Sequence, residues 1–312
     1  MKQPSVSVVI PVNNRYPLLL EAVHSVLAQS VPAAEVIVVD DGSTDIGPAE
    51  VTALTAMTPS PPAAPATGTA PPVRYHHIDH CGMPGAVRNA GVALCRGEWL
   101  AFLDSDDLWY PDKLARQLEC TRLFPDRPLV HTRERWLRNG REVSQAGQRH
   151  AREGLVFADA LHKCIIGPST VLMRRDLFEE LGGFRSDLEV AEDYELWLRL
   201  TARHPVAYVD APLIDKRAGH GDQLSEKYGQ IERFRIDALQ RLVDEGYFAR
   251  VDADAGRSRQ STHEMSRAEL ARAALARKCS IYARGAAKRG KADEARRYDE
   301  LAADYGWRAA PD

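Results

Sequence analysis

Residues 5–12 read SVSVVIPV and residues 35–40 read EVIVVD, and these two β-branched runs decide the fold class. Such nearly continuous apolar runs are typical of strands that a parallel sheet buries on both faces. Between them, apolar residues recur at helical spacing from Leu18 to Leu27, and Pro17 stands near the start, where its missing N–H costs little. Strand, helix and strand in this order predict a βαβ unit and therefore a doubly wound α/β sheet.

The alternation of strands and helices continues beyond this unit. A Pro- and Ala-rich stretch at residues 58–72, TPSPPAAPATGTAPP, has few side chains that could join a core, so we expect a flexible exposed insertion there. The elements expected after it are a strand at 73–78, a helix at 84–95, a strand at 99–103, a helix at about 112–123, and short elements at 155–161, 169–173, 194–202 and 206–209.

After about residue 226 the pattern changes, because strand signals stop and helical periodicity takes over. We therefore expect two parts, an α/β domain at residues 1–225 and a helical C-terminal region at 226–312. Within the latter, the stretch 266–297 carries ten basic residues against three acidic ones. A solvated helical face explains this charge most simply, and peripheral contact with an anionic membrane surface is the alternative.

Composition and charge limit the class of protein. The chain has 312 residues, 44% of them hydrophobic and 27% charged, which is typical of a soluble globular protein. Its 41 Lys and Arg against 44 Asp and Glu give a net charge of −3, so we expect no nucleic acid partner. The five cysteines are scattered without a C-x-x-C pair, which favours a reducing compartment over a zinc ribbon or a disulfide framework. No apolar run suits a signal peptide or a membrane span, so the expected location is the cytoplasm.

Acidic residues follow two of the predicted strands. Asp40 and Asp41 close one of them, and Asp104, Asp106 and Asp107 come directly after another. Ligands of open α/β sheets bind at the carboxyl ends of the strands, so these carboxylates should converge at the binding edge. They would repel each other unless a cation compensates, and a hard divalent cation, Mn²⁺ or Mg²⁺, suits oxygen ligands. On extended backbone, Asp104 and Asp106 point the same way, roughly 6.5–7 Å apart, so one can hold a sugar hydroxyl and the other the metal.

Other sites find less support. Residues 76–81 read HHIDHC, but on a strand His76 faces away from His77 and Asp79, so a transition-metal site is not favoured. No dinucleotide fingerprint, P-loop or G-x-S-x-G string occurs. Acidic strand ends therefore remain the main indication of chemistry.

Six short motifs occur in order between about Ser5 and Ser225. They are VIPVNNR at 9–15, SVLAQ at 25–29, VVDDGS at 38–43, AVRNAG at 86–91, FLDSDD at 102–107 and ED at 192–193. Together they resemble the family 2 glycosyltransferases, whereas any one of them alone would be unspecific. The resemblance implies a GT-A type, doubly wound sheet, mixed but mostly parallel and flanked by helices. It also implies an inverting enzyme that uses a nucleotide diphosphate sugar, and it does not cover the helical C-terminal region.

The resemblance further implies roles for individual residues. Pro11 and Val12 would lie against the nucleotide, which we expect to be that of a UDP-sugar, and Asp41 would accept a hydrogen bond from uracil. Asp104 would meet the ribose and Asp106 the Mn²⁺ or Mg²⁺ ion. The remaining implied roles are Arg88 near the base or its phosphates, Asp193 as general base, and Arg217, His220, Gln223 and Ser225 in a loop that folds over the donor diphosphate.

The chain departs from the family's pattern at two places. Asn13 stands where relatives commonly have an aromatic residue, and residues 80–84 read HCGMP where an Asn-x-Gly is usual. These departures leave the donor sugar pocket less defined than the uridine pocket. The sequence does not identify the acceptor, for which we expect a glycan, a lipid-linked glycan or a small molecule.

Alternatives remain both for the function of the chain and for the roles of individual residues. A nucleotidyltransferase that makes a nucleotide sugar would share the sheet, although residues 11–14, PVNN, are not the Gly-rich basic loop that such enzymes need. A catalytically silent sugar-nucleotide-binding protein would keep the same motifs. Arg88 could merely pair with a carboxylate at the sheet edge. Asp193, whose acidic neighbour is Glu192, could merely complement a helix dipole.

Overall fold

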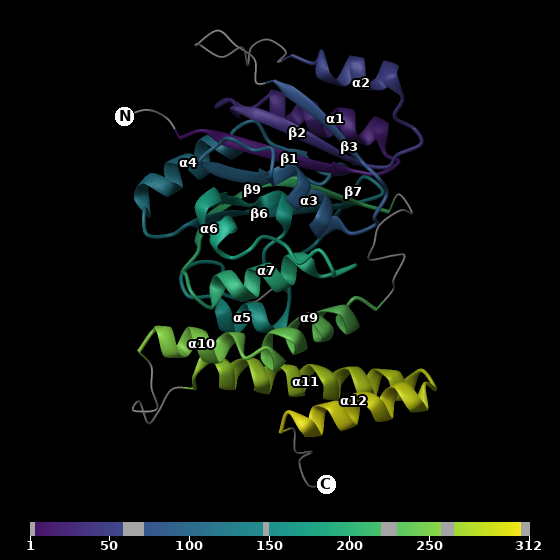
Figure 1. Ribbon diagram of the computed structural model, residues 1–312, viewed down its shortest axis with the longest axis vertical. Coiled ribbons are helices and arrows are strands. Elements are labelled where there is room, and N and C mark those ends of the chain that lie inside the picture. The colour runs from purple at the N-terminus through teal and green to yellow at the C-terminus, as the bar shows by residue number, and fades with distance from the viewer. Residues whose placement is uncertain (1–3, 59–71, 146–149, 220–229, 257–264, 307–312) are drawn as a thin grey trace.

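Within the described part of the chain, one nine-stranded sheet with helices on both faces forms the upper part of the molecule in Figure 1. The computed structural model describes residues 4–58, 72–145, 150–219, 230–256 and 265–306. The strand order is β3-β2-β1-β4-β8-β6-β9-β5, and β7 pairs with β6. The doubly wound, mixed sheet expected from the sequence is thereby confirmed.

The first half of the sheet is parallel. It consists of β1 (Val6–Val12), β2 (Glu35–Asp41), β3 (Val73–Ile78) and β4 (Trp99–Phe102). In the register, Val12 lies beside Asp40 of β2, and Val9 lies beside Phe102 of β4. The carboxyl ends of these strands therefore meet at one edge.

The second half is mostly antiparallel. Its strands are β5 (Leu108–Trp109), β6 (Leu129–Arg138), β7 (Arg141–Val143), β8 (Leu172–Arg174) and β9 (Ala207–Ala218). Strand β8 joins the two halves, because it runs antiparallel to both β4 and β6. Strands β6 and β9 run parallel to each other, with register shifts after Thr132 and Arg133.

Helices cover both faces of the sheet, which is why β1 is apolar at nearly every position. Its residue Ile10 belongs to the same hydrophobic cluster as Val23 of α1 and Leu114 of α4. On the opposite face, Val9 packs in a cluster with residues of α3, α6 and α7. The helices of this part are α1 (Tyr16–Leu27), α2 (Pro48–Thr55), α3 (Pro84–Val92), α4 (Lys113–Leu123), α6 (Arg175–Glu180) and α7 (Glu192–Thr201), with a 3₁₀ turn at Pro168–Thr170.

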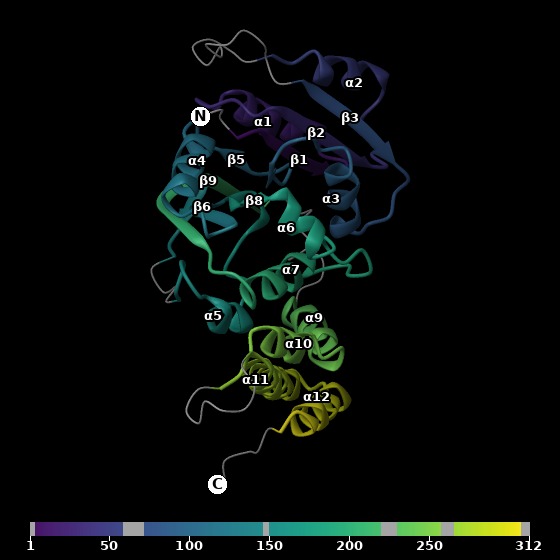
Figure 2. The same cartoon turned by 60° about the vertical axis from the view of Figure 1, so that its left-hand side comes forward.

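A third hydrophobic cluster joins helices that lie below the sheet in Figure 2. It contains residues of α5 and α7 together with residues of the C-terminal helices, such as Tyr194, Leu198, Leu239 and Leu275. The elements that it adds are α5 (Phe157–His162), α9 (Glu232–Asp244), α10 (Tyr247–Asp254), α11 (Arg267–Lys288) and α12 (Ala292–Asp304). The helical C-terminal region thus packs on α5 and α7 and shares their core. The domain boundary at 225/226 falls in undescribed residues and stays a prediction.

Two further expectations concern the insertion and the membrane. Of the insertion expected at 58–72, residues 59–71 lie outside the described part of the chain. Within the described ranges, no helix is both long and apolar enough to cross a membrane.

Candidate active site

Three loops meet at the carboxyl edge of the parallel strands. They follow β1 at residues 13–15, β2 at 42–44 and β4 at 103–107. The Leu103 amide donates a hydrogen bond to Val9 O at 3.0 Å, and the Asn13 side chain donates one to Asp41 O at 2.6 Å. The acidic strand ends that the sequence indicated are therefore neighbours in space. Pro11 and Val12, expected to lie against a nucleotide, form the end of β1 opposite Val39 and Asp40.

The two carboxylates at the end of β2 have different surroundings. Asp40 is fully buried and accepts hydrogen bonds from the Tyr75 hydroxyl and the Ser43 amide. Burial alone would raise the pKa of Asp40, but these hydrogen bonds outweigh it and lower the pKa. Asp40 is therefore a structural anion of the turn.

Asp41 instead fastens the loop that follows β3. Its Oδ1 accepts from the Cys81 amide at 2.7 Å and its Oδ2 from the Gly82 amide at 3.0 Å. His80 Nδ1 also lies 3.1 Å from Asp41 Oδ2. Asp41 therefore lies at the expected edge of the sheet, where its carboxylate binds the backbone of the loop after β3. A contact between Asp41 and uracil stays a prediction.

The turn after β4 concentrates negative charge. Asp107 Oδ2 accepts from the Ser169 hydroxyl at 2.7 Å, and the same hydroxyl accepts from the Asp104 amide at 3.1 Å. Burial, together with the charges of Asp104 and Asp106, raises the pKa of Asp107 well above its ordinary value. The Ser169 hydroxyl thus ties Asp104 to Asp107, and the turn has more negative charge than its own residues can balance.

Two arginines from other elements contact this turn. Arg15, just before α1, forms an ion pair with Asp106 at 2.9 Å. Arg217, near the end of β9, donates its backbone N–H to Asp107 Oδ1 at 3.1 Å and its side-chain Nε–H to Asp106 O. Arg217 therefore reaches the acidic turn as expected, whereas His220, Gln223 and Ser225 lie outside the described residues.

Lys216 is a further cation at this edge that the sequence did not indicate. The negative charge of Glu134 and those of Asp107 and Asp104 raise the pKa of Lys216 against the opposing effect of burial. Lys216 lies on β9 beside Trp136 of β6. No sequence signal could have placed it here, because its position depends on a pairing between strands far apart in the chain.

Arg88 of α3 joins the acidic turn to the start of α7. Its Nη2 donates to Asp104 Oδ1 at 2.7 Å and its Nη1 donates to Glu192 Oε1 at 2.5 Å. Arg88 and Glu192 are each only 5% exposed, so the bridge is buried. Pairing with Asp104 is the simpler of the two roles expected for Arg88, and a contact with a nucleotide stays a prediction. Burial raises the pKa of Glu192, although Arg88 acts against it.

Asp193 follows in the first turn of α7. Ala191, which precedes this helix, has a left-handed backbone conformation with φ of 69°. Asp193 Oδ1 accepts from the Tyr194 amide at 2.6 Å, and Cys164 Sγ lies 3.4 Å from Asp193 Oδ2. Burial and the adjacent Asp193 raise the pKa of the Cys164 thiol, which therefore stays protonated and can donate to this carboxylate. Nothing in the sequence pointed to Cys164.

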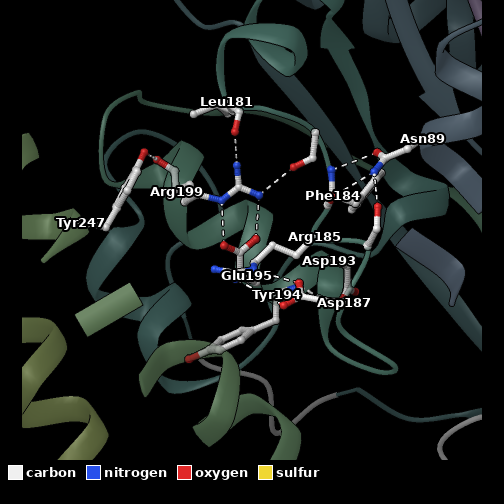
Figure 3. A network of polar contacts seen from close by, with 12 residues as sticks. Asn89, Leu181, Phe184, Arg185, Asp187, Asp193, Tyr194, Glu195, Arg199 and Tyr247 are labelled. Atoms are coloured by element: carbon white, nitrogen blue, oxygen red, sulfur yellow. Dashed lines mark hydrogen bonds and ion pairs between the residues drawn. The ribbon is translucent and has the colours of Figure 1, made fainter. Parts of the chain in front are cut away.

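A polar network holds α7 in place (Figure 3). Arg199 forms a bidentate ion pair with Glu195 on the same helix and donates to the backbone carbonyls of Leu181 and Gly183. Asn89 of α3 donates to Phe184 O at 2.7 Å and accepts from the Phe184 amide at 3.0 Å. The loop before α7 is therefore tied to both α7 and α3, which fixes Asp193 relative to Arg88.

A divalent cation at the acidic turn would have to be shared with a ligand. Within the described residues, no three His, Cys, Asp or Glu side chains are arranged to hold a metal by themselves. Asp106 supplies a hard carboxylate oxygen, and Mg²⁺ is commonly held by one or two carboxylates, water and substrate phosphates. A cation at Asp106 would thus need the oxygens of a bound diphosphate.

Comparisons with known proteins bear on the family of the chain. A family model described as glycosyl transferase family 2 matches residues 7–182, more than half of the chain. An uncharacterized glycosyltransferase of Rickettsia felis is 31% identical over 218 residues, which cover 69% of this chain. The match covers 33% of that protein, so the chain spans about a third of the length of this relative.

Solved structures share the fold. The S. aureus protein TarS, residues 1–349 in complex with UDP-GlcNAc, has a TM-score of 0.60 at 18% identity, with 98% of this chain and 93% of that chain covered. The mannosyltransferase PcManGT from Pyrobaculum calidifontis, in complex with GDP-Man and Mn²⁺, has a TM-score of 0.53 at 21% identity, with 99% and 82% covered. The sheet is therefore of the GT-A type. Because the family model matches the chain from β1 to α6, and the fold agrees with that match, the chain belongs to glycosyl transferase family 2.

Proposed function

We propose that this chain transfers a sugar from a nucleotide diphosphate donor, a UDP-sugar, to a hydroxyl group of an acceptor, with inversion at the anomeric carbon. One observation carries the proposal: the buried Arg88 bridge joins Asp104 at the sheet edge to Glu192, next to Asp193. The carboxyl edge of the parallel strands and the start of α7 are thereby held together, which supports a donor site beside a carboxylate base. The complexes of the structural neighbours with UDP-GlcNAc and with GDP-Man and Mn²⁺ support the class of donor.

We assign contacts with the sugar donor to residues at the carboxyl edge of the parallel strands. Pro11 and Val12 would contact the nucleotide, Asp41 the uracil ring and Asp104 the ribose. Arg217, with His220, would face the diphosphate, and Arg88 would add positive charge nearby. These assignments and that of Asp106 are proposals, and their support is the convergence of the described residues at one sheet edge.

The chemical step is a single displacement. The acceptor oxygen forms a bond to the anomeric carbon while the bond from that carbon to the diphosphate oxygen breaks, and the acceptor proton passes to the Asp193 carboxylate. A divalent cation, Mn²⁺ or Mg²⁺ at Asp106, would stabilise the charge of the departing diphosphate when bound. Arg88 pairs with Asp104 and Glu192, and Asp193, the neighbour of Glu192 in the first turn of α7, would face the bound sugar.

The acceptor and the cellular location belong to the same proposal. We expect a glycan, a lipid-linked glycan or a small molecule as acceptor, and a cytoplasmic protein. Arg277, Arg284 and Lys288 are exposed on α11 at helical spacing, with Ile281, which is 48% exposed, among them. This face suits peripheral contact with an anionic membrane.

Donor binding can be tested by thermal unfolding with UDP-, GDP- and dTDP-sugars, each with and without Mn²⁺. A ligand at 100 times its Kd stabilises the folded state by about 2.7 kcal/mol, so binding should raise the Tm measurably. We expect a Mn²⁺-dependent rise with a UDP-sugar that Asp106→Asn abolishes, because an amide is a weaker ligand for a hard cation.

Two outcomes would contradict the proposal. If no nucleotide sugar raises the Tm with or without Mn²⁺, the chain does not bind the donor. If UTP and a sugar 1-phosphate instead yield pyrophosphate, the chain is a nucleotidyltransferase.

A further inference from the structure

The carboxylate proposed to hold the metal already has a cationic partner. Arg15 Nη1 lies 2.9 Å from Asp106 Oδ2, and the two side chains are only 20% and 10% exposed. Water therefore screens this ion pair less than it would at an open surface. Arg15 and Asp106 are 91 positions apart in the chain, so the contact is a product of the tertiary fold.

Helix capping does not account for the position of the Arg15 side chain. Arg15 occupies the N-cap position of α1, but its side chain makes no capping hydrogen bond. The preceding residue fixes the loop instead: the Asn14 amide donates to Ser43 Oγ at 2.9 Å, and Asn14 Oδ1 accepts from the Thr44 amide at 2.7 Å. The backbone of Arg15 is thus held beside the end of β2, with its guanidinium directed at the acidic turn.

We propose that Arg15 and a divalent cation compete for the Asp106 carboxylate, so that Arg15 couples metal binding to nucleotide binding. The inference rests on the proposed role of Asp106 in holding the metal. A guanidinium and a divalent cation repel each other at one carboxylate. A diphosphate supplies negative charge to the same place, which relieves this repulsion. The metal therefore binds weakly alone and more tightly with the nucleotide, and the two affinities are linked.

Measurement of Mn²⁺ affinity tests this directly, without any turnover. Free Mn²⁺ is titrated by electron paramagnetic resonance against the full chain, with and without saturating UDP, for wild type and Arg15→Gln. Removing the guanidinium should lower the Kd for Mn²⁺ alone by ~3–10-fold, the range expected for a partly buried ion pair. The factor by which UDP tightens Mn²⁺ binding should shrink in Arg15→Gln.

A matched arginine provides the control. Arg74 Nη1 lies 3.0 Å from Glu35 Oε2, at the start of β2 and therefore at the opposite edge of the sheet. Arg74→Gln removes an ion pair of similar length that lies away from the acidic turn, so it should leave both Mn²⁺ affinities unchanged. Circular dichroism of both variants shows that each is folded.

The outcomes separate this inference from the proposed function. Tighter binding of Mn²⁺ alone in Arg15→Gln, with Arg74→Gln like wild type, supports competition. Equal or weaker binding in Arg15→Gln, while Asp106→Asn still abolishes it, overturns the inference and leaves the role of Asp106 intact. Absence of Mn²⁺ binding in wild type, with or without UDP, overturns the metal role of Asp106 and the inference together.

Discussion

Arg88 links residues that are far apart in the chain. Its partner Glu192 lies 104 positions away and its partner Asp104 lies 16 positions away. Both carboxylates and the guanidinium are largely withdrawn from water, so each depends on the others for compensation. This single side chain therefore contributes both to stability and to the arrangement of the site.

We expect Arg88→Met to lower the free energy of unfolding by about 3 kcal/mol, because it leaves two carboxylates without their cation. In the Glu192→Gln background the same substitution should cost clearly less, since one of the carboxylates is then neutral. Urea unfolding of the four proteins in this double-mutant cycle measures the difference. Arg174→Met is the control: Arg174 and its partner Asp176 are 50% and 61% exposed. An exposed pair of this kind should cost less than about 1 kcal/mol. Equal costs at Arg88 and Arg174 would show that the bridge is not important for stability.

Some of the individual residues of the site could be predicted from the sequence. The acidic residues after β2 and β4 could be placed at one edge, because parallel strands align their carboxyl ends. Glu192, Lys216 and Cys164 could not be assigned, because their positions depend on how α7, β9 and the loop before Ile166 pack. Local sequence carries no information about that packing.

Helix α3 packs tightly against the sheet at Gly91. A Cβ at this position would lie 2.5 Å from Val9 Cγ1 and 2.9 Å from Val39 Cγ2, so the two strands and the helix would have to separate. At Gly285 in α11, the nearest atom to a Cβ is the flexible end of Arg289, at 3.0 Å. The two helical glycines therefore differ in what surrounds them.

We expect opposite effects from the same substitution at these glycines. Gly91→Ala should lower the free energy of unfolding by about 1–3 kcal/mol through overpacking. Gly285→Ala should raise it by ~0.5–1 kcal/mol, because alanine favours the helix more than glycine does. Denaturant unfolding of both variants measures these changes, and a stabilising Gly91→Ala would contradict the close packing of α3.

A buried histidine in β6 makes stability depend on pH. His131 is 1% exposed and its Nε2 donates to Arg152 O at 2.6 Å. Burial lowers the pKa of His131 from 6.5 to about 4. The unfolded chain therefore binds this proton at a higher pH than the folded chain, so the contribution of His131 is complete above pH 6.5 and is lost as the pH falls toward 4.

The expected size of this effect is about 2 kcal/mol between about pH 7 and pH 5. Wild type should lose that much more stability over this interval than His131→Gln, which cannot titrate. Urea unfolding at both pH values gives the difference between the two proteins, in which the other histidines cancel. Parallel losses in wild type and variant would show that His131 keeps its ordinary pKa when folded.

Elements of the parallel half were predicted well, and those of the antiparallel half were not. Strands β1, β2, β3 and β4 are apolar or follow clear breaks, and the structure confirms them. Strand β6 was not expected, because its second half is charged and mostly exposed. Strand β9 was expected only at 206–209 but extends to Ala218, past Pro212 and a register shift. Hydrophobic periodicity cannot indicate strands of this polar kind.

In the molecule as a whole, the α/β part and the C-terminal helical region, which we expected as two parts, pack against each other. Helical periodicity correctly predicted helices after residue 226, but the packing of α9 and α11 on α5 and α7 could not be inferred from it. Figure 1 shows these helices in layers below the sheet, with α11 and α12 farthest from β1. Asp193 thus stands on a helix that the sheet contacts on one side and the C-terminal helices on the other.

The central claim is that this arrangement presents Asp193 as the base of glycosyl transfer. The competing interpretation is an acidic residue that only complements the helix dipole, which is worth about 0.3–1 kcal/mol of stability. Asp293 is a matched control for that interpretation, because it is an acidic residue in the first turn of α12, far from the acidic strand ends. Asp193→Asn and Asp293→Asn therefore make the same chemical change in two different places.

The most direct measurement compares donor binding and product formation for wild type, Asp193→Asn and Asp293→Asn on the same preparations. Calorimetry with the UDP-sugar identified by thermal unfolding should give similar Kd values for all three proteins. Product formation should fall by at least ~10²-fold in Asp193→Asn, because an amide cannot take the acceptor proton, and should stay unchanged in Asp293→Asn. Turnover near that of wild type in Asp193→Asn, with donor binding intact, would contradict the account and direct attention to Glu192.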